Sequence, residues 1–274
     1  MSALKTYKLY IGGAFPRTES GRFIEIRNTQ GELVANLCKA SRKDVRNSVV
    51  AARKAQKGWA DRTGYNRAQI LYRLAEMLHS RRASLAEEWA GVQPEKNADK
   101  RGLEVMDMAI DCLIHYAGWA DKFLQVAGSV NPVAGPYFNF STLEPTGVVA
   151  VLAHSFLGAM EQLAAAVVSG NAVVVVVDGP EGLPFMSFAE VVHTSDVPAG
   201  VLNLLTGSLD ELKGTVSSHG DINAVALPGN PDLWLEEMRA AADTVKRIAF
   251  AQGNSLEQIL AFTETKTVWH PVGA

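Results

Sequence analysis

The side chains that could carry out chemistry are few, because the chain has only six histidines and two cysteines. Cys112 and His115 lie three residues apart in a stretch with helical spacing, so they could present two ligands to one metal ion. A zinc site needs three or four protein ligands, and no further cysteine or histidine lies nearby. We therefore interpret the pair as core or surface residues, and the sequence predicts no metal site.

Two further pairs resemble a nucleophile with its base. His154 precedes Ser155 directly, and His219 lies two residues before Asp221. Adjacent side chains rarely point at each other, and a catalytic triad also needs a carboxylate that orients the histidine. We interpret the first pair as part of a loop and the second as a turn before a strand. The chain has neither a Walker lysine motif nor a clean G-x-G-x-x-G fingerprint.

The bulk composition is that of an ordinary globular protein, with 47% apolar and 20% charged residues in 274. A formal net charge of −3 provides no basic field for a phosphate backbone, which argues against a nucleic-acid partner. The apolar stretch from Ala164 to Val177 is interrupted by Ser169, Gly170 and Asn171, so it is too broken to span a bilayer. The opening MSALKTYKLY lacks a signal-peptide core, and we expect a cytoplasmic protein without a membrane partner.

Short strands and then four helices are predicted for the N-terminal half. Residues 7–15, 23–28 and 31–40 alternate around turns, and Ser41-Arg42-Lys43-Asp44 is a variant of the capping box that starts a helix reaching Trp59. Apolar spacing predicts three further helices, at about 67–80, 85–89 and 103–123. Residues 124–144 alternate around Asn131-Pro132 and Gly135-Pro136, which predicts a two-stranded hairpin.

From residue 147 the chain alternates strand and helix. The predicted strands are 147–152, 171–177, 200–207, 222–229 and 245–251, and helices are predicted at 160–168, 184–193, 210–218 and 232–242. Mostly apolar strands joined by helices predict an α/β fold, with a parallel sheet covered by helices on both faces. The closing segment TKTVWHPVGA has strand character and no helix of its own.

Several ordered segments resemble the aldehyde dehydrogenase superfamily, and together they cover nearly the whole chain. They are residues 10–59 (YIGGAF to KAQKGW), RAQILYRLAEML at 67–78, EPTGVVAVL at 144–152, SGN at 169–171, PAGVLNLLTG at 198–207, HGDINAVAL at 219–227, KRIAF at 246–250 and FTETKTVWHPVG at 262–273. Among subfamilies, the likeness is closest to the non-catalytic C-terminal half of the family-sixteen enzymes, which is shortened in the same way.

This resemblance implies a Rossmann-type domain for NAD or NADP, a catalytic domain with a cysteine nucleophile, and a bridging arm. In the family, the thiolate attacks an aldehyde, hydride passes to nicotinamide, and a glutamate-activated water releases the acid. An asparagine side chain and a backbone amide stabilise the oxyanion. These are the parts to look for in this chain.

The first parts of the family site are missing. The family's asparagine lies in a PWNFP loop, where this chain has AHSFLG and no asparagine between Gly147 and Gly170. The lysine and glutamate of the family's KPSE turn fall at Val176 and Gly179. Five valines thus lead into Asp178-Gly179-Pro180 with no basic side chain at the strand's tip.

The phosphate turn and the catalytic groups also depart from the family pattern. In the GST-x-x-G turn Gly229 is kept, but Asn230 and Pro231 follow, and Trp234 replaces the last glycine, where an indole should obstruct a phosphate. The ELGG glutamate falls at Ala251. We therefore predict that no residue of this chain is catalytic, cofactor-binding or metal-binding, and that it carries no cofactor.

The nucleophile has no counterpart, because the family places it in a domain that this chain skips. Gly253 lies only twelve residues before Thr265, where the last strand is predicted to begin. Cys38 and Cys112 lie far upstream, and we interpret each as a small buried hydrophobe.

The resemblance implies the following organisation. Residues 1–123 and 145–255 form the Rossmann-type domain, residues 124–144 and 256–274 form an oligomerisation arm, and the catalytic domain is absent. In the family such arms pair with the sheet of a neighbouring subunit, and pairing at a sheet edge provides affinity. An exposed strand without a partner is an aggregation hazard, so we expect the arm to bind another chain.

Three functions remain open at this stage. The first is a catalytically inactive subunit that docks on a full-length aldehyde dehydrogenase through the hairpin and the C-terminal strand. The second is a module that still binds NAD(P) in its crevice, against which Val176, Gly179 and Trp234 argue. The third is a subunit that contributes to NAD-dependent aldehyde oxidation in a hetero-oligomer by using the partner's cysteine.

Overall fold

Five parallel strands form the central sheet of the computed structural model, which describes residues 4–94, 96–250 and 253–273. The strand order is β10-β9-β6-β7-β8, with bounds β6 Val148–Ala153, β7 Ala172–Val177, β8 Leu202–Thr206, β9 Ala224–Leu227 and β10 Arg247–Phe250. The strands β6 to β9 are buried along their whole length, as their apolar sequences require. The predicted α/β fold with a parallel sheet is confirmed.

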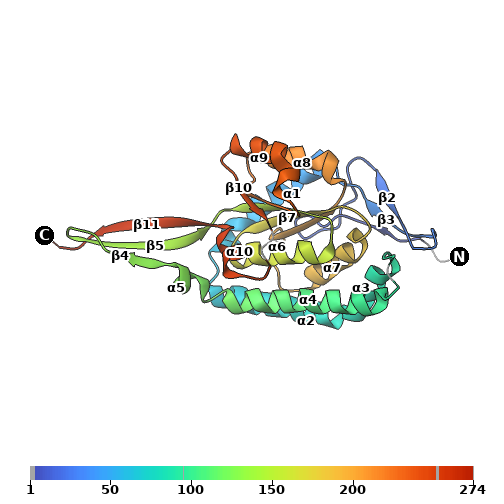
Figure 1. The fold of residues 1–274 in the computed structure, drawn as a ribbon, viewed down its shortest axis with the longest axis horizontal. Helices are drawn as coiled ribbons and strands as arrows, with labels where there is room; N and C mark the ends of the chain where they lie inside the picture. Colours follow the sequence, from blue (N-terminus) through green and yellow to red (C-terminus); the bar gives the residue numbers. More distant parts are fainter. Residues whose placement is uncertain (1–3, 95, 251–252, 274) are drawn as a thin grey trace.

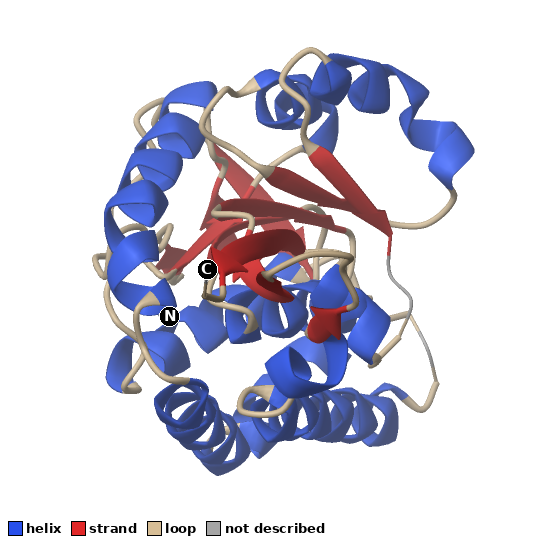
Figure 2. Cartoon of the chain, turned by 90° about the vertical axis from the view of Figure 1, so that its left-hand side faces the viewer, coloured by secondary structure: helices blue, strands red, loops and turns tan. Residues whose placement is uncertain are grey.

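Helices cover both faces of the sheet, as Figure 2 shows in end view. Alternate strand residues such as Val174 and Val176 face one layer, and Val173, Val175 and Val177 face the other. The first layer contains α1 Arg42–Ala60, α8 Leu209–Ser218 and α9 Leu235–Ala242 (Figure 1). The second contains α6 Phe156–Val168 and α7 Gly182–Thr194, backed by α2 Gly64–Ser80, α3 Arg82–Gly91 and α4 Ala98–Trp119.

The capping box predicted at Ser41 is present. The Ser41 Oγ accepts from the Asp44 amide, and the Asp44 carboxylate accepts from the Ser41 amide at 2.8 Å. Asp44 is buried, and it also accepts from the Thr18 hydroxyl at 2.7 Å. The box therefore ties the loop before β2 to the start of α1.

A small N-terminal sheet lies beside the main one. It contains β1 Thr6–Tyr7, β3 Leu33–Cys38 and β2 Phe23–Arg27, in the order β1-β3-β2. Tyr10 exchanges two backbone hydrogen bonds with Leu204 of β8, at 2.9 and 2.8 Å. The N-terminal segment thus covers part of the β8 edge of the main sheet.

A third sheet forms a long projection from the body, which we call the arm (Figure 1). Its strand order is β11-β5-β4, with bounds β4 Ser129–Asn131, β5 Tyr137–Pro145 and β11 Thr263–Pro271. The predicted hairpin is present but shorter than expected. Residues 123–127 form a short helix, α5 Phe123–Ala127, because Phe123 is buried in the body and the Gly128 amide donates back to the Leu124 carbonyl.

Other boundaries also differ from the prediction. The helix predicted at 103–123 begins at Ala98 and ends at Trp119, because a solvated run of charged residues forms its first turn. The helix predicted at 85–89 extends over Arg82–Gly91. The helix predicted at 232–242 begins as a 3-10 turn, η1 Pro231–Trp234, and continues as α9. One short helix, α10 Leu256–Leu260, has no counterpart in the prediction. In the described ranges, no helix combines the length and apolar character that crossing a membrane requires.

Candidate functional site

The strand order locates the place where a parallel sheet of this kind can bind a ligand. The chain proceeds from β6 through β7 to β8 on one side, and then returns to β9 on the other side of β6. In open α/β sheets, ligands bind at such a switch point, outside the carboxyl ends of the strands. We call the region beyond the carboxyl ends of β6 and β9 the crevice.

The residues that follow β6 act as helix caps. His154 is exposed, and the Ser155 Oγ accepts from the Gly158 amide at 3.1 Å, which caps α6. The Phe156 amide, at the first position of the helix, donates to the Glu181 carboxylate at 2.6 Å. A backbone amide that a dinucleotide phosphate could use is therefore bound to the chain's own carboxylate.

At the carboxyl end of β7, the strand of five valines, a carboxylate of the chain again binds a helix amide. Val176 is fully buried in the layer of α1 and α8, so the position of the family lysine does not face solvent. Asp178 follows the strand, and its carboxylate accepts from the Leu209 amide at 2.9 Å, at the first residue of α8. Gly179 has a φ of +91°, a left-handed turn that suits glycine. The residue after this strand thus presents a carboxylate to the start of α8.

The turn after β9 is filled by Trp234. The Asn230 side chain caps η1 by accepting from the Asp232 amide at 3.0 Å. The Trp234 side chain is buried, and its Nε1 donates to the Pro228 carbonyl at 2.7 Å. The indole expected to obstruct a phosphate therefore packs into the body at the end of β9.

The two cysteines lie in buried positions that do not form a site. Cys38 belongs to β3 and Cys112 to α4, and both are buried free thiols. Burial, together with the Glu161 carboxylate, raises the pKa of Cys112 far above its usual range, so this thiol stays protonated. Among the described residues, no cluster of three or more histidine, cysteine, aspartate and glutamate side chains could hold a metal ion.

The remaining sequence candidates also have local partners or lie outside the described ranges. The Asp221 amide donates to the His219 Nδ1 at 3.2 Å, which is the expected turn before β9. Burial lowers the pKa of His219 below its usual value. Ala251, at the position of the family glutamate, lies outside the described residues.

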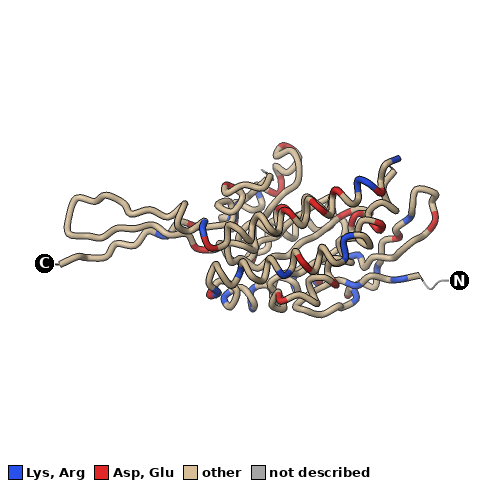
Figure 3. Tube along the Cα trace, turned by 90° about the horizontal axis from the view of Figure 1, so that it is seen from below, with Lys and Arg blue, Asp and Glu red and all other residues tan. Residues whose placement is uncertain are grey.

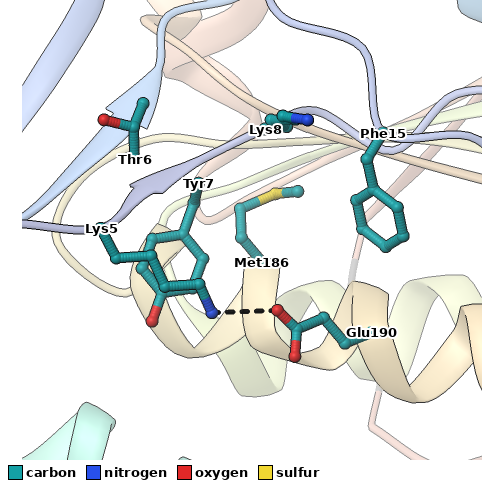
Figure 4. Close-up of a pocket in the computed structure, with 7 residues that line it drawn as sticks. All are labelled: Lys5, Thr6, Tyr7, Lys8, Phe15, Met186 and Glu190. Atoms are coloured by element: carbon teal, nitrogen blue, oxygen red, sulfur yellow. Dashed lines mark hydrogen bonds and ion pairs between the residues drawn. The ribbon is translucent and has the colours of Figure 1, made fainter.

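A cavity that sequence reasoning missed lies between β1 and α7 (Figure 4). It has a volume of about 380 Å³, and Tyr7, Phe15 and Met186 supply much of its apolar lining. Lys5 Nζ lies 2.9 Å from the Glu190 carboxylate and 4.0 Å from the centre of the Tyr7 ring. No local pattern predicts this cavity, because its walls come from segments far apart in the sequence.

The arm is an exposed sheet with an uncharged outer part. Nine residues of β11 pair antiparallel with β5, from Thr263 opposite Pro145 to Pro271 opposite Tyr137. Residues 129–143 and 267–273 contain no lysine, arginine, aspartate or glutamate, in contrast to the body (Figure 3). In the part of the chain that the structure describes, no strand lies beside the outer edge of β11.

Exposed aromatic side chains lie on both faces of the arm. Trp269 is 59% exposed and forms an edge-to-face contact with Tyr137, with ring centroids 5.9 Å apart. On the opposite face, Val130 and Phe138 are exposed, and the Phe138 and Phe140 centroids lie 5.5 Å apart. Exposed aromatic groups on an uncharged sheet are typical of a surface that binds another protein.

Comparisons with known proteins all identify the same family. The family model described as "Aldehyde dehydrogenase family" matches residues 15–262. DhaS of Bacillus subtilis (strain 168), itself assigned as a candidate aldehyde dehydrogenase, is 30% identical over 266 residues, which cover 93% of this chain and 52% of DhaS.

Solved structures of the same family are similar in fold. The NAD+ complex of an aldehyde dehydrogenase from Bacillus cereus has a TM-score of 0.83 at 26% identity, covering 89% of this chain and 50% of that one. Betaine aldehyde dehydrogenase from Staphylococcus aureus in complex with NAD+ has a TM-score of 0.83 at 22% identity, covering 90% and 50%. This chain therefore spans about half the length of the relatives it matches.

Proposed function

Because this chain belongs to the aldehyde dehydrogenase family, we propose that it is a catalytically inactive subunit of a larger assembly. It associates with a full-length, active aldehyde dehydrogenase as a structural or regulatory partner. The arm makes the contact, and the partner performs any oxidation of aldehyde. The likeness to the non-catalytic half of family-sixteen enzymes and the cytoplasmic location are parts of the same proposal.

The observation that carries the proposal is the exposed arm with its uncharged outer part. Its strand β11 has a free outer edge in the described structure, and Trp269 lies exposed beside Tyr137. A free edge with an exposed aromatic side chain is suited to strand addition, in which backbone hydrogen bonds provide affinity and side chains provide specificity. Such an edge is avoided in proteins that stay monomeric.

The path of the chain between sheet and arm supports the lack of catalysis. β10 ends at Phe250 and β11 begins at Thr263, so only residues 251–262 join them, and α10 is the element described there. The family inserts its catalytic domain, with the nucleophile, at this point. Cys112 is buried and protonated, so it is a poor replacement for that nucleophile.

Co-expression tests the association. The tagged chain is expressed with the aldehyde dehydrogenase encoded nearest to it, followed by affinity capture and size-exclusion chromatography. We expect a co-eluting complex, which Trp269→Ser weakens by more than about tenfold, as loss of a central aromatic residue does at interfaces. Phe23→Ser is the matched control, because Phe23 is an aromatic residue 55% exposed on β2, which lies at the opposite end of the molecule from the arm (Figure 1).

Two outcomes would contradict the proposal. One is a well-behaved monomer that captures no aldehyde dehydrogenase. The other is a complex that Phe23→Ser weakens as strongly as Trp269→Ser does, which would place the contact on the body.

The alternative is that the crevice still binds NAD(P), either as a binding module or as part of a hetero-oligomer that oxidises aldehydes with NAD. Titration of the isolated chain with NADH, followed by the fluorescence of the nicotinamide, separates these functions from the proposed one. Saturation at micromolar NADH favours the alternative. Without binding, the use of a partner's cysteine also fails, because the partner's nicotinamide would have to lie in this crevice.

A further inference from the structure

The indole of Trp234 lies at the switch point of the sheet. Pro228 directly follows β9, and its carbonyl accepts from the Trp234 Nε1 at 2.7 Å. The side chain is only 6% exposed and packs in the same apolar cluster as Leu227 of β9. The ring therefore occupies space at the carboxyl end of β9, where the fold favours a ligand.

Helix α8 contacts the same ring from a second side. Lys213 Nζ lies 5.9 Å from the centre of the Trp234 ring, within the range of a cation–π interaction. The same ammonium lies 3.4 Å from the carboxylate of Glu237, which is buried on α9. A hydrogen-bond acceptor at its edge and a cation over its face are interactions that would also hold the planar base of a nucleotide.

On the other side of the switch point, a carboxylate occupies the start of α6. Glu181 accepts from the Phe156 amide at 2.6 Å, and the Gln93 side chain donates to its second oxygen at 3.1 Å. Helix N-termini stabilise anions such as phosphate because free amides and the helix dipole converge there. Here the anion is supplied by the chain itself.

We propose that Trp234 and Glu181 are internal occupants of a latent adenine-nucleotide site, the indole in place of the base and the carboxylate in place of a phosphate. At both places the chain supplies its own side chain to a backbone group, so the crevice is closed from within. This proposal does not depend on the arm. The latent site can therefore be absent while the association with an aldehyde dehydrogenase is real, or present while that association is absent.

The experiment opens the site by substitution and uses AMP as the probe. Thermal unfolding of the whole chain is measured with and without millimolar AMP for the wild type, Trp234→Ala and Trp59→Ala. Trp59 is a matched control because its buried indole also donates to a backbone carbonyl, that of Val167 at 2.8 Å, near the start of β7 rather than at the carboxyl ends of the strands. We expect AMP to raise the Tm of Trp234→Ala by about 2–4 °C and to leave the other two unchanged.

Indole serves as a second probe, because it fills any cavity of suitable shape without needing a nucleotide site. We expect indole to raise the Tm of both alanine variants. The double variant Trp234→Ala/Glu181→Gln should bind AMP more tightly than Trp234→Ala, since a negative charge beside the phosphate is removed.

Two results would overturn the proposal. One is a folded Trp234→Ala variant that responds to indole and not to AMP, which would make Trp234 a core residue without a latent site. The other is a wild-type chain that binds AMP as tightly as the variant, which would mean that the crevice is open. If Trp234→Ala does not fold, Trp234→Phe keeps a ring in the core and is compared with Trp59→Phe in the same way.

Discussion

At the scale of single residues, Val245 has a backbone conformation that its side chain disfavours. Its φ is +53°, and its amide and that of Lys246 donate to the carbonyls of Ala242 and Ala241, which closes α9 in the manner of a Schellman motif. Glycine or asparagine is usual at this position, and a β-branched residue is strained there by about 1–2 kcal/mol. Val245 is also 89% exposed, so little packing compensates for the strain.

Val245→Asn should therefore stabilise the chain by about 0.5–1 kcal/mol, measured as the free energy of unfolding in urea. Val50→Asn is the control, because Val50 is exposed in the interior of α1, where valine and asparagine have similar helix propensities. An unchanged or lower stability for Val245→Asn would mean that the turn gains support from contacts beyond the side chain.

The pKa of Cys112 makes stability depend on pH. Burial, with a smaller contribution from Glu161, raises the pKa of this thiol in the folded chain. Above the ordinary thiol pKa of about 8.5, the unfolded chain loses a proton that the folded chain keeps. The stability that this thiol contributes is thus fully present below that pH and is lost as pH rises, by up to about 1.4 kcal/mol per pH unit.

Urea unfolding at several pH values between about 7.5 and 10 measures this slope on both sides of the ordinary thiol pKa. We expect Cys112→Ala to be less steep than the wild type, since alanine has no proton to lose. Identical slopes for the two proteins would assign the pH dependence to other groups, such as Tyr116, whose pKa burial also raises.

At the scale of elements, the serines that precede α1 and α8 differ in whether their side chains cap the helix. Ser41→Ala removes the hydroxyl that caps α1 and should cost about 1 kcal/mol, measured by urea unfolding. Ser208 stands at the same position of α8, but its side chain makes no capping hydrogen bond, and the Asp178 carboxylate accepts from the Leu209 amide at the start of this helix. Ser208→Ala should therefore change stability by less than about 0.5 kcal/mol. An equal loss for both variants would contradict this assignment of the caps.

The sequence predicts the elements that have a strong repeating pattern and misses the short ones. The apolar strands and the capping box at Ser41 are predictable because burial and capping leave local signals. The pattern predicts a strand where α5 lies, because five residues are too few to show a helical period and the position of this helix depends on the burial of Phe123. Val245 falls in a predicted strand for a similar reason, since its β-branched side chain does not indicate a left-handed turn.

The crevice could be predicted only in part. The replacements at Val176, Gly179 and Trp234 are visible in the sequence through the resemblance to a family. The contacts of Glu181 with α6 and of Asp178 with α8 are not, because each joins segments 25 and 31 residues apart, respectively. Only the packed sheet shows that the amides at these helix starts already have partners.

At the scale of the whole molecule, the body and the arm should differ in local stability. The strands of the body are buried between two layers of helices, whereas the arm projects with solvent on both faces (Figure 1). Amides exchange with solvent through local opening, and regions with few buried contacts open at a lower free energy. In the isolated chain, amides of β11 should exchange faster than those of β7, which hydrogen–deuterium exchange with mass spectrometry can measure.

Addition of the proposed partner, a full-length aldehyde dehydrogenase, should change this pattern in one region. If the arm forms the contact, protection should increase in peptides that cover 263–273 and 129–145, because a new strand satisfies the outer amides of β11 and covers Trp269. Peptides that cover α9 and the Trp234 turn should be unchanged, because the latent site is closed within the chain. Protection confined to α9 would place the interface on the body and would contradict a function carried by the arm.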